Sequence, residues 1–220
     1  MAKKKFKPLK VLVACEYSGV VRDEFIKLGH NAISCDLLPT DVPGPHIQGD
    51  VLDVIDSSFD MLIAFPPCTH LTRACGHLWA EKRKAGLQQD AIEFVKKLML
   101  APIKHIAIEN PLGILSQAIR KPDQIIHPYY FGEEKQKATC LWLKNLPPLK
   151  PTKIVGRGDF KIYYSKHTGK MKKYPMWQYE VYAKVRKQDR WKVRSTTFKG
   201  IAEAMAKQWS TPGYIQGKLF

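Results

Sequence analysis

Several features that define other classes of protein are missing from this 220-residue sequence. No apolar run approaches the roughly 20 residues that cross a membrane, and the basic residues 1–10 lack the apolar stretch of a secretory signal. The five cysteines form no Cys-x-x-Cys pair, and neither they nor His70 and His77 have metal-ligand spacing. We therefore expect reduced thiols in a cytoplasm, no disulfide framework and no metal.

Acidic residues are also scarce. The sequence holds 20 Asp and Glu against 36 Lys and Arg, which gives a net charge of +16 and a pI near 9.6. This excess favours a polyanionic partner, nucleic acid first and an anionic membrane surface second. Residues 150–199 carry 15 basic and 3 acidic residues together with nine aromatic ones. Bases stack on aromatic rings, so the mixture favours nucleic acid over the alternative, a merely solvated lysine-rich surface.

The first 150 residues alternate between short apolar runs and segments with helical spacing. Four runs predict buried strands: 10–15, 31–35, 59–65 and 105–109. Helices are expected between them at 20–28, which Gly29 ends, and at 79–100, with a proline-rich loop at 39–45. Strands joined by helices need crossover connections. We therefore expect an α/β fold with a mostly parallel sheet.

The pattern changes beyond residue 150. Turn signals at 156–159 and 166–170 flank residues 160–165, whose alternation predicts one arm of a β-hairpin. Residues 201–209 return to helical spacing, with an apolar face made of Ala202, Met205, Ala206 and Trp209. We divide the chain into three parts: a core at 1–150, a small basic and aromatic segment at 151–194, and a C-terminal helical part at 195–220.

Polar or small residues follow four of the predicted strands: Glu16 to Gly19, Asp36, Pro66 to Cys68, and Glu109 with Asn110. Parallel sheets bind ligands at the carboxyl ends of their strands, so these residues predict a site at one edge. There Asp36 could accept hydrogen bonds from ribose hydroxyls, and Asp50 could approach an adenine amine. Ordinary turn residues are the alternative for each. Residues 16–19 have too few glycines for a dinucleotide fingerprint.

Cys68 is the candidate nucleophile. Two prolines fix the backbone before it, and a thiolate adds readily to an electron-poor carbon, although a small core residue is the alternative. A carboxylate at Glu109 could hydrogen-bond or protonate a ring nitrogen of a bound base. Asn110 and Pro111 also fit the N-terminus of a helix, and the two interpretations are compatible.

Taken in order, these segments resemble the cytosine-5 DNA methyltransferase family, most closely its short members of phage or prophage type. The resemblance covers nearly the whole chain. It assigns nine residues to the binding of S-adenosylmethionine: Cys15, Glu16, Tyr17, Ser18, Gly19, Asp36, Asp50, Val51 and Pro66. It assigns five to catalysis: Pro67, Cys68, Glu109, Asn110 and Lys137. Phe131 and Gly132 resemble the pair that opens a later catalytic strand, and residues 195–209 resemble the family's last motif.

The resemblance implies a Rossmann-like fold of the S-adenosylmethionine-dependent methyltransferases. Residues 1–150 would bind the cofactor and catalyse, and residues 151–194 would recognise double-stranded DNA, with no membrane or metal involved. The implied reaction is methylation of cytosine carbon 5, in which the Cys68 thiolate adds to carbon 6 and Glu109 contacts a ring nitrogen. The enzyme would act in the cytoplasm of a bacterium or of a phage-infected host cell.

The sequence departs from the family at a few positions. The family's Gln-x-Arg-x-Arg pattern is replaced by Lys135, Lys137 and Thr139, and the residue after the catalytic cysteine is Thr69. Lys137 could replace one arginine, whereas Thr139 lacks a guanidinium fork. Two alternatives stay open: a non-catalytic DNA-binding relative, and the same chemistry on RNA or a nucleotide. Methylation of an exocyclic amine is disfavoured because it needs a hydrogen-bond acceptor where Phe65 stands.

Overall fold

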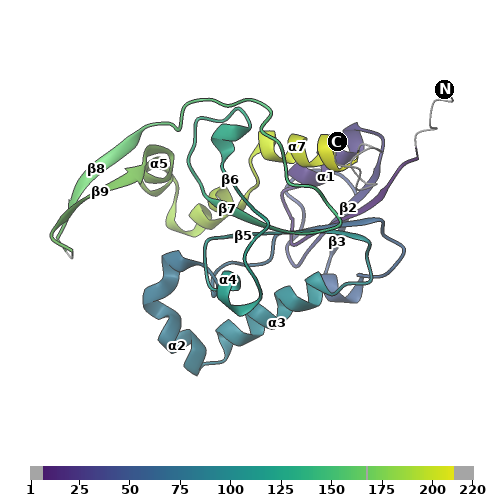
Figure 1. Ribbon diagram of the computed structural model, residues 1–220, viewed down its shortest axis with the longest axis horizontal. Helices are drawn as coiled ribbons and strands as arrows, with labels where there is room; N and C mark the ends of the chain where they lie inside the picture. The colour runs from purple at the N-terminus through teal and green to yellow at the C-terminus, as the bar shows by residue number, and fades with distance from the viewer. Residues whose placement is uncertain (1–6, 167, 211–220) are drawn as a thin grey trace.

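The computed structural model describes residues 7–166 and 168–210. Residues 211–220 of the predicted C-terminal part lie outside this range, as do the first six residues of the basic N-terminus. In the described chain, helices flank both faces of a seven-stranded sheet, and a two-stranded hairpin extends from one side (Figure 1). No helix in this part of the chain is long and apolar enough to span a membrane.

The central sheet is mostly parallel. Its strands in spatial order are β3 (His46–Gln48), β2 (Asn31–Asp36), β1 (Lys10–Ala14), β4 (Met61–Ala64), β5 (His105–Pro111), β7 (Thr139–Lys144) and β6 (Gln124–Ile126). The pairs from β3 across to β5 are parallel, and β7 runs antiparallel to both of its neighbours, β5 and β6. The predicted α/β class with a mostly parallel sheet is therefore confirmed.

Helices pack on both faces because the inner strands are apolar on both faces. On one face lie α1 (Val20–Lys27) and α7 (Lys199–Trp209), and on the other lie α3 (Leu87–Met99) and α4 (Leu115–Ala118) (Figure 1). Alternate residues of β1 contribute to the two hydrophobic cores. The predicted apolar face of the last helix is confirmed, since all four of its residues are buried in α7.

Two details differ from the expectation. The helical pattern at 79–100 forms two helices, α2 (Trp79–Lys84) and α3, because Gly86 adopts a left-handed φ of 75° between them. The expectation that Asn110 and Pro111 begin a helix is wrong, because both residues continue β5 and pair with Cys140 and Thr139 of β7. The side chain of Asn110 is consequently available for a contact across the sheet edge.

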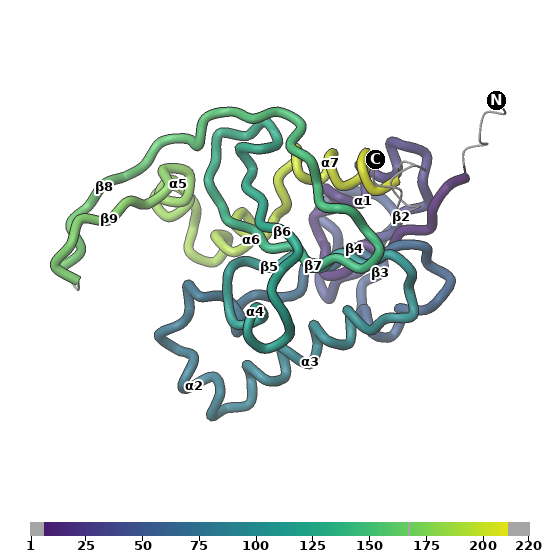
Figure 2. The backbone as a smooth tube through the Cα atoms, viewed as in Figure 1, coloured from purple at the N-terminus to yellow at the C-terminus, as the bar shows by residue number. Residues whose placement is uncertain are grey.

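The basic segment folds outside the sheet. Its predicted hairpin arm is confirmed as β8 (Phe160–Ser165), which pairs antiparallel with β9 (Lys170–Pro175). Figure 2 follows the chain out along this hairpin and back through α5 (Met176–Lys184) and α6 (Arg190–Ser195) toward α7. Short 3-10 helices are η1 (Val51–Asp53), η2 (Arg73–Leu78), η3 (Pro128–Tyr130) and η4 (Lys187–Asp189).

Candidate active site

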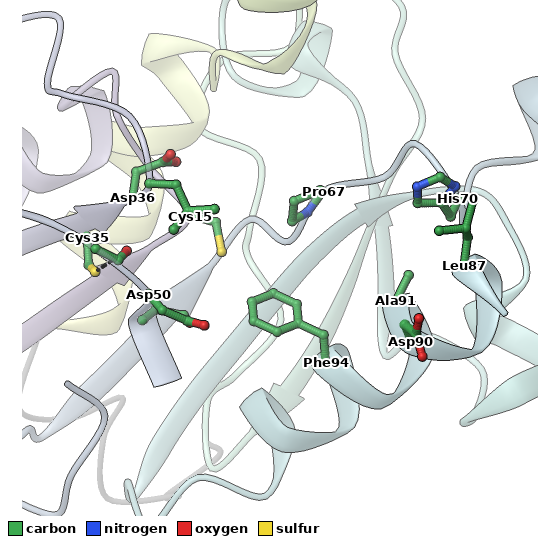
Figure 3. A pocket seen from close by; sticks show the side chains of 13 residues that line it. Cys15, Cys35, Asp36, Asp50, Pro67, His70, Leu87, Asp90, Ala91 and Phe94 are labelled. Atoms are coloured by element: carbon green, nitrogen blue, oxygen red, sulfur yellow. Dashed lines mark hydrogen bonds between the residues drawn. The ribbon is translucent and has the colours of Figure 1, made fainter. Parts of the chain in front are cut away.

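A cavity of about 350 Å³ opens at the carboxyl ends of β1, β2 and β4. The strand order changes direction between β1 and β4, which is where open α/β sheets bind ligands. The cavity lies between the sheet edge and α3 (Figure 3), and its volume suits a ligand of cofactor size. Its lining residues are Cys15, Cys35, Asp36, Leu37, Gly49, Asp50, Val51, Pro67, His70, Leu87, Asp90, Ala91 and Phe94.

This cavity is acidic although the chain as a whole is strongly basic. Asp36, Asp50 and Asp90 line it, and within the described ranges no Lys or Arg does. Burial raises the pKa of Asp36, while a hydrogen bond from the Leu38 N–H (3.0 Å) opposes that rise. A ligand bearing phosphates would be repelled here. A neutral or cationic ligand with hydroxyl or amine donors would be favoured.

Two thiols form part of the same wall. Cys15 has a φ of 56°, which is uncommon for a residue other than glycine. Burial, followed by the charge of Asp36, raises the pKa of Cys15 and also that of Cys35, the latter to about 11. Both thiols are therefore neutral at physiological pH and act as apolar lining rather than as nucleophiles.

Glu16, predicted to bind the cofactor, does not line the cavity. Its carboxylate is buried and accepts hydrogen bonds from the N–H groups of Val21 (2.7 Å) and Arg22 (3.3 Å) at the start of α1. Burial raises the pKa of Glu16 to about 7 even though these hydrogen bonds favour the charged form. The side chain therefore holds the first turn of a helix.

The next three predicted residues also lie outside the lining of the cavity. The Tyr17 ring packs against Trp191 of α6 with ring centroids 5.5 Å apart, and its hydroxyl lies 3.2 Å from Ser195 Oγ. The Ser18 hydroxyl donates to the Glu16 carboxylate (3.3 Å). Gly19 has a φ of 71°, and a Cβ there would collide with a buried arginine side chain. These residues organise the turn and its contact with the basic segment.

The loop after β4 connects this cavity to a second group of residues. Pro67 lines the cavity, whereas Pro66 is buried and its carbonyl accepts a hydrogen bond from Asn110 Nδ2 (2.8 Å). The bond ties the end of β4 to β5 just before Cys68. Asn110 Oδ1 is also buried, and it finds no hydrogen-bond partner in the described chain. Asn110 is thus a positioning residue for the loop that carries the thiol.

Cys68 is half-buried and lies within electrostatic reach of Glu109, Lys137 and Arg194. The Lys137 ammonium donates to the Arg194 carbonyl (2.8 Å) and lies 5.5 Å from the ring centroid of Phe198. A cavity of about 10 Å³ is lined by Phe65, Glu109, Lys137, Thr139, Ser195, Thr197, Phe198, Ile201 and Met205. That volume holds roughly one water molecule, so a larger ligand requires these side chains to move.

Burial shifts the pKa of the Cys68 thiol and that of the Glu109 carboxyl group upward. Burial raises the pKa of Cys68, and the neighbouring Glu109 charge adds to the rise, while Lys137 and Arg194 lower it. Burial also raises the pKa of Glu109, against the charge of Lys137 and a hydrogen bond from Thr139. A protonated Glu109 can donate a hydrogen bond to a ring nitrogen, and thiolate formation at Cys68 depends on the two basic residues.

The structure gathers nine of the fourteen predicted residues into two adjoining groups, and leaves Glu16 to Gly19 and Pro66 outside both. Cys15, Asp36, Asp50, Val51 and Pro67 line the large cavity. The second group consists of Cys68, Glu109, Lys137 and the positioning residue Asn110.

Three residues beside the second group were not predicted as site residues: Arg194, Phe198 and Trp177. The indole of Trp177 donates to the Gln136 carbonyl (3.1 Å) and packs edge-on against Phe198, with ring centroids 5.6 Å apart. Trp177 was visible as an aromatic residue of the basic segment, but nothing in the sequence indicated that it returns to the sheet edge. Phe198 lies in the part at 195–220, whose helix the resemblance expects to return to the catalytic core.

A scan of the chain against models of protein families found no match, and a search of curated proteins found none either.

Proposed function

We propose that this protein methylates carbon 5 of cytosine in DNA, with S-adenosylmethionine as the methyl donor and Cys68 as the covalent nucleophile. One observation carries the proposal: a single loop, ending at Cys68, has an acidic cavity of cofactor size on one side and a carboxyl–lysine cluster on the other. The seven-stranded, mostly parallel sheet that positions this loop supports the Rossmann-like methyltransferase fold that the family resemblance implies.

The large cavity fits S-adenosylmethionine by size and charge. Asp36 and Asp50, at adjacent strand ends, would accept hydrogen bonds from the ribose and adenine groups, and Phe94 would cover an apolar ring face. The acidic lining suits the positive charge of a sulfonium and disfavours a phosphate-bearing cofactor. When bound, the cofactor supplies an electrophilic methyl group.

Residues of the second group would carry out the work on the base. Burial raises the pKa of Glu109, and in its protonated form the carboxyl group would donate a hydrogen bond to a cytosine ring nitrogen and so withdraw electrons from the ring. Cys68 thiolate would then add to carbon 6, which makes carbon 5 nucleophilic. Loss of the carbon 5 proton to a base later expels Cys68 and restores the double bond. Lys137 would favour the thiolate through its charge.

The target base must reach this group from outside the helix stack. Because the small cavity admits only about one water molecule, entry of a base requires the side chains of residues 195–198 or Lys137 to shift. Phe65 lines this cavity and has no hydrogen-bond acceptor, which disfavours methylation of an exocyclic amine at the same place.

The test is transfer of label from radioactive S-adenosylmethionine to duplex DNA by the full chain, with digestion to identify 5-methylcytosine. We expect label in 5-methylcytosine, and a loss of at least about a thousandfold for Cys68→Ala, because a nucleophile has been removed. Cys75→Ala, which removes another half-buried cysteine, should transfer normally. Label found in RNA and not in DNA would show that the substrate is RNA.

Duplex containing 5-fluorocytosine provides a second readout, because the missing proton traps Cys68 on carbon 6. A stable protein–DNA adduct that Cys68→Ala abolishes is expected for the enzyme. DNA binding without transfer and without an adduct would refute the proposal and indicate a non-catalytic DNA-binding protein.

A further inference from the structure

Tyr17 follows β1 but does not line the large cavity, although the resemblance assigns it to the cofactor. Its side chain is 6% exposed and contacts α6 instead. The ring packs against Trp191 with centroids 5.5 Å apart, and the hydroxyl donates to the Lys192 carbonyl (3.3 Å) and lies 3.2 Å from Ser195 Oγ. A buried tyrosine whose hydroxyl bonds to a neighbouring element fixes that element in position.

A second set of contacts ties α6 to the loop after β2. The Lys192 ammonium lies 3.3 Å from the Asp41 carboxylate and 5.5 Å from the centroid of the Tyr17 ring. The Asp41 N–H in turn donates to the Tyr17 carbonyl (2.9 Å), so the loops after β1 and β2 form one surface for α6. The ion pair is about half exposed and contributes little by itself, which leaves buried Tyr17 as the main contact.

The last residues of α6 reach the second group of site residues. The Arg194 carbonyl accepts the hydrogen bond of the Lys137 ammonium (2.8 Å). The Arg194 guanidinium donates to the Tyr182 hydroxyl (3.0 Å), and Ser195 lines the small cavity. Because α6 has only six residues, a displacement where it contacts Tyr17 also moves Arg194.

The contacts of Tyr17 act on Cys68 indirectly. The charges of Lys137 and Arg194 lower the pKa of the Cys68 thiol against the effect of burial. Among the described residues, Tyr17 and Lys192 do not belong to the groups that act on this thiol directly. Because the attraction between charges falls with distance, the thiolate is favoured only while both cations are held close to it.

We propose that Tyr17 is a positioning residue: by fixing α6 on the loops after β1 and β2, it holds Lys137 and Arg194 close enough to Cys68 to keep the thiol reactive. The inference rests on the proposed function only in taking Cys68 as the reacting group. It differs from direct contact of Tyr17 with the cofactor, which the resemblance implies. Loss of the Tyr17 contacts should lower the reactivity of Cys68 and leave the affinity for S-adenosylmethionine unchanged.

The test is alkylation of the full chain by iodoacetamide over a range of pH, with the label at Cys68 measured by mass spectrometry. Tyr17→Phe keeps the ring and loses the hydroxyl, whereas Tyr17→Leu loses both contacts. We expect the rate at pH 7 to fall about threefold in Tyr17→Phe and about tenfold in Tyr17→Leu, because one pKa unit changes the thiolate fraction about tenfold. Both profiles should shift to higher pH.

Two controls accompany these variants. Tyr163→Phe makes the same change at an exposed tyrosine of the β8–β9 hairpin, and its Cys68 should be alkylated as in the native chain. Cys75, the other half-buried cysteine after β4, serves as an internal reference, because a loss of folding would change its labelling too. Its labelling should be the same in every variant.

A double-mutant cycle separates positioning from a general loss of stability. In a chain that carries Lys137→Gln and Arg194→Gln, α6 no longer holds cations beside Cys68. Tyr17→Leu should therefore change the alkylation of Cys68 by less than about twofold in that chain. Calorimetric titration should give Tyr17→Phe an affinity for S-adenosylmethionine within about twofold of the native value, because Tyr17 does not line the cavity.

Three results would overturn the inference: native alkylation of Cys68 in both Tyr17 variants, equal slowing of Cys68 and Cys75, or the same effect of Tyr17→Leu with and without the two cations. Native alkylation together with a loss of cofactor affinity would return Tyr17 to the cofactor site. A shifted alkylation profile in a chain that transfers no methyl group would refute only the proposed function. Methyl transfer with unshifted profiles in both variants would refute only the positioning role.

Discussion

Replacing Glu16 with glutamine should remove a pH-dependent penalty on the folded state. The pKa of Glu16 rises from 4.5 to about 7 because its carboxyl group is buried. Below pH 4.5 the Glu16 carboxyl group is protonated in both the folded and the unfolded chain, so its burial does not lower the free energy of unfolding. Between pH 4.5 and about 7 the unfolded chain has lost this proton and the folded chain keeps it, so stability falls across this range by about 3 kcal/mol, at roughly 1.4 kcal/mol per pKa unit, and then levels off. The glutamine side chain retains an oxygen that can accept from the Val21 N–H, so E16Q should be more stable than the native chain by up to this amount at pH 8.

Urea unfolding at pH 5, 6, 7 and 8, followed by circular dichroism, measures this difference directly. The gap in unfolding free energy between E16Q and the native chain should widen from about 1 kcal/mol at pH 5 to about 3 kcal/mol at pH 7 and change little from pH 7 to 8. Glu93→Gln is the control: the Glu93 side chain is about half exposed, a hydrogen bond and ion pair with Lys96 (2.8 Å) lower its pKa, and its small effect should have the opposite sign. A gap that stays constant from pH 5 to 8, or one that favours the native chain at high pH, would refute the reasoning.

Two further expectations concern the two groups of site residues. Asp36→Asn should weaken the binding of S-adenosylmethionine about tenfold or more in calorimetric titration, because a charged acceptor lining the cavity is lost. Asp53→Asn is the control, because Asp53 lies outside the cavity and its replacement should leave the affinity unchanged. Equal affinity in the two variants would place the cofactor elsewhere. Lys137→Gln should raise the pKa of Cys68 further and shift its alkylation by iodoacetamide to higher pH, as followed by mass spectrometry. Lys135→Gln is the matched control, since Lys135 also lies over the Phe198 ring (5.1 Å) but is absent from the charges that act on Cys68, and identical profiles for the two variants would contradict the assignment.

Strands β1, β2, β4 and β5 could be predicted because each is covered on both faces and reads as a short, mainly apolar run, whereas β7, also an inner strand, was not predicted from its pattern. The edge strands β3 and β6 could not: each has three residues, and their sequences, His-Ile-Gln and Gln-Ile-Ile, carry too little pattern. The reversed direction of β7 depends on how the chain returns from η3, which no local pattern encodes. The Phe131–Gly132 pair, expected to open this strand, precedes its first residue, Thr139, by several residues.

The helical spacing of apolar residues did not predict the break between α2 and α3, because the glycine at the break leaves that spacing intact. The apolar spacing of residues 79–100 continues through Gly86, yet that residue adopts a left-handed φ and begins a new helix. A single glycine in a helical pattern is compatible with either outcome, and the choice depends on packing. Asn110 shows the same ambiguity, since Asn followed by Pro suits a helix start as well as the end of a strand.

Strand ends were the informative signal for the site, because parallel strands bring their carboxyl ends to a common edge. That rule brought together Cys68 and Glu109, which are far apart in the sequence. It could not say which way each side chain turns. A carboxylate between a strand and a helix can bind a ligand or accept the unpaired N–H groups of the helix, and Glu16 does the latter.

The amino-acid composition gives the net charge of the chain but does not show where the charged side chains lie in the structure. A net charge of +16 suggests a single basic surface, yet Asp36, Asp50 and Asp90 gather in the cavity while the lysines and arginines concentrate in residues 150–199. The loop at 66–68 lies between these regions, with Pro67 in the acidic cavity and Cys68 within reach of Lys137 and Arg194. One loop thus borders two environments of opposite charge. That arrangement suits a reaction between a cationic small molecule and a polyanion, and it disfavours any reaction in which both reactants carry phosphates.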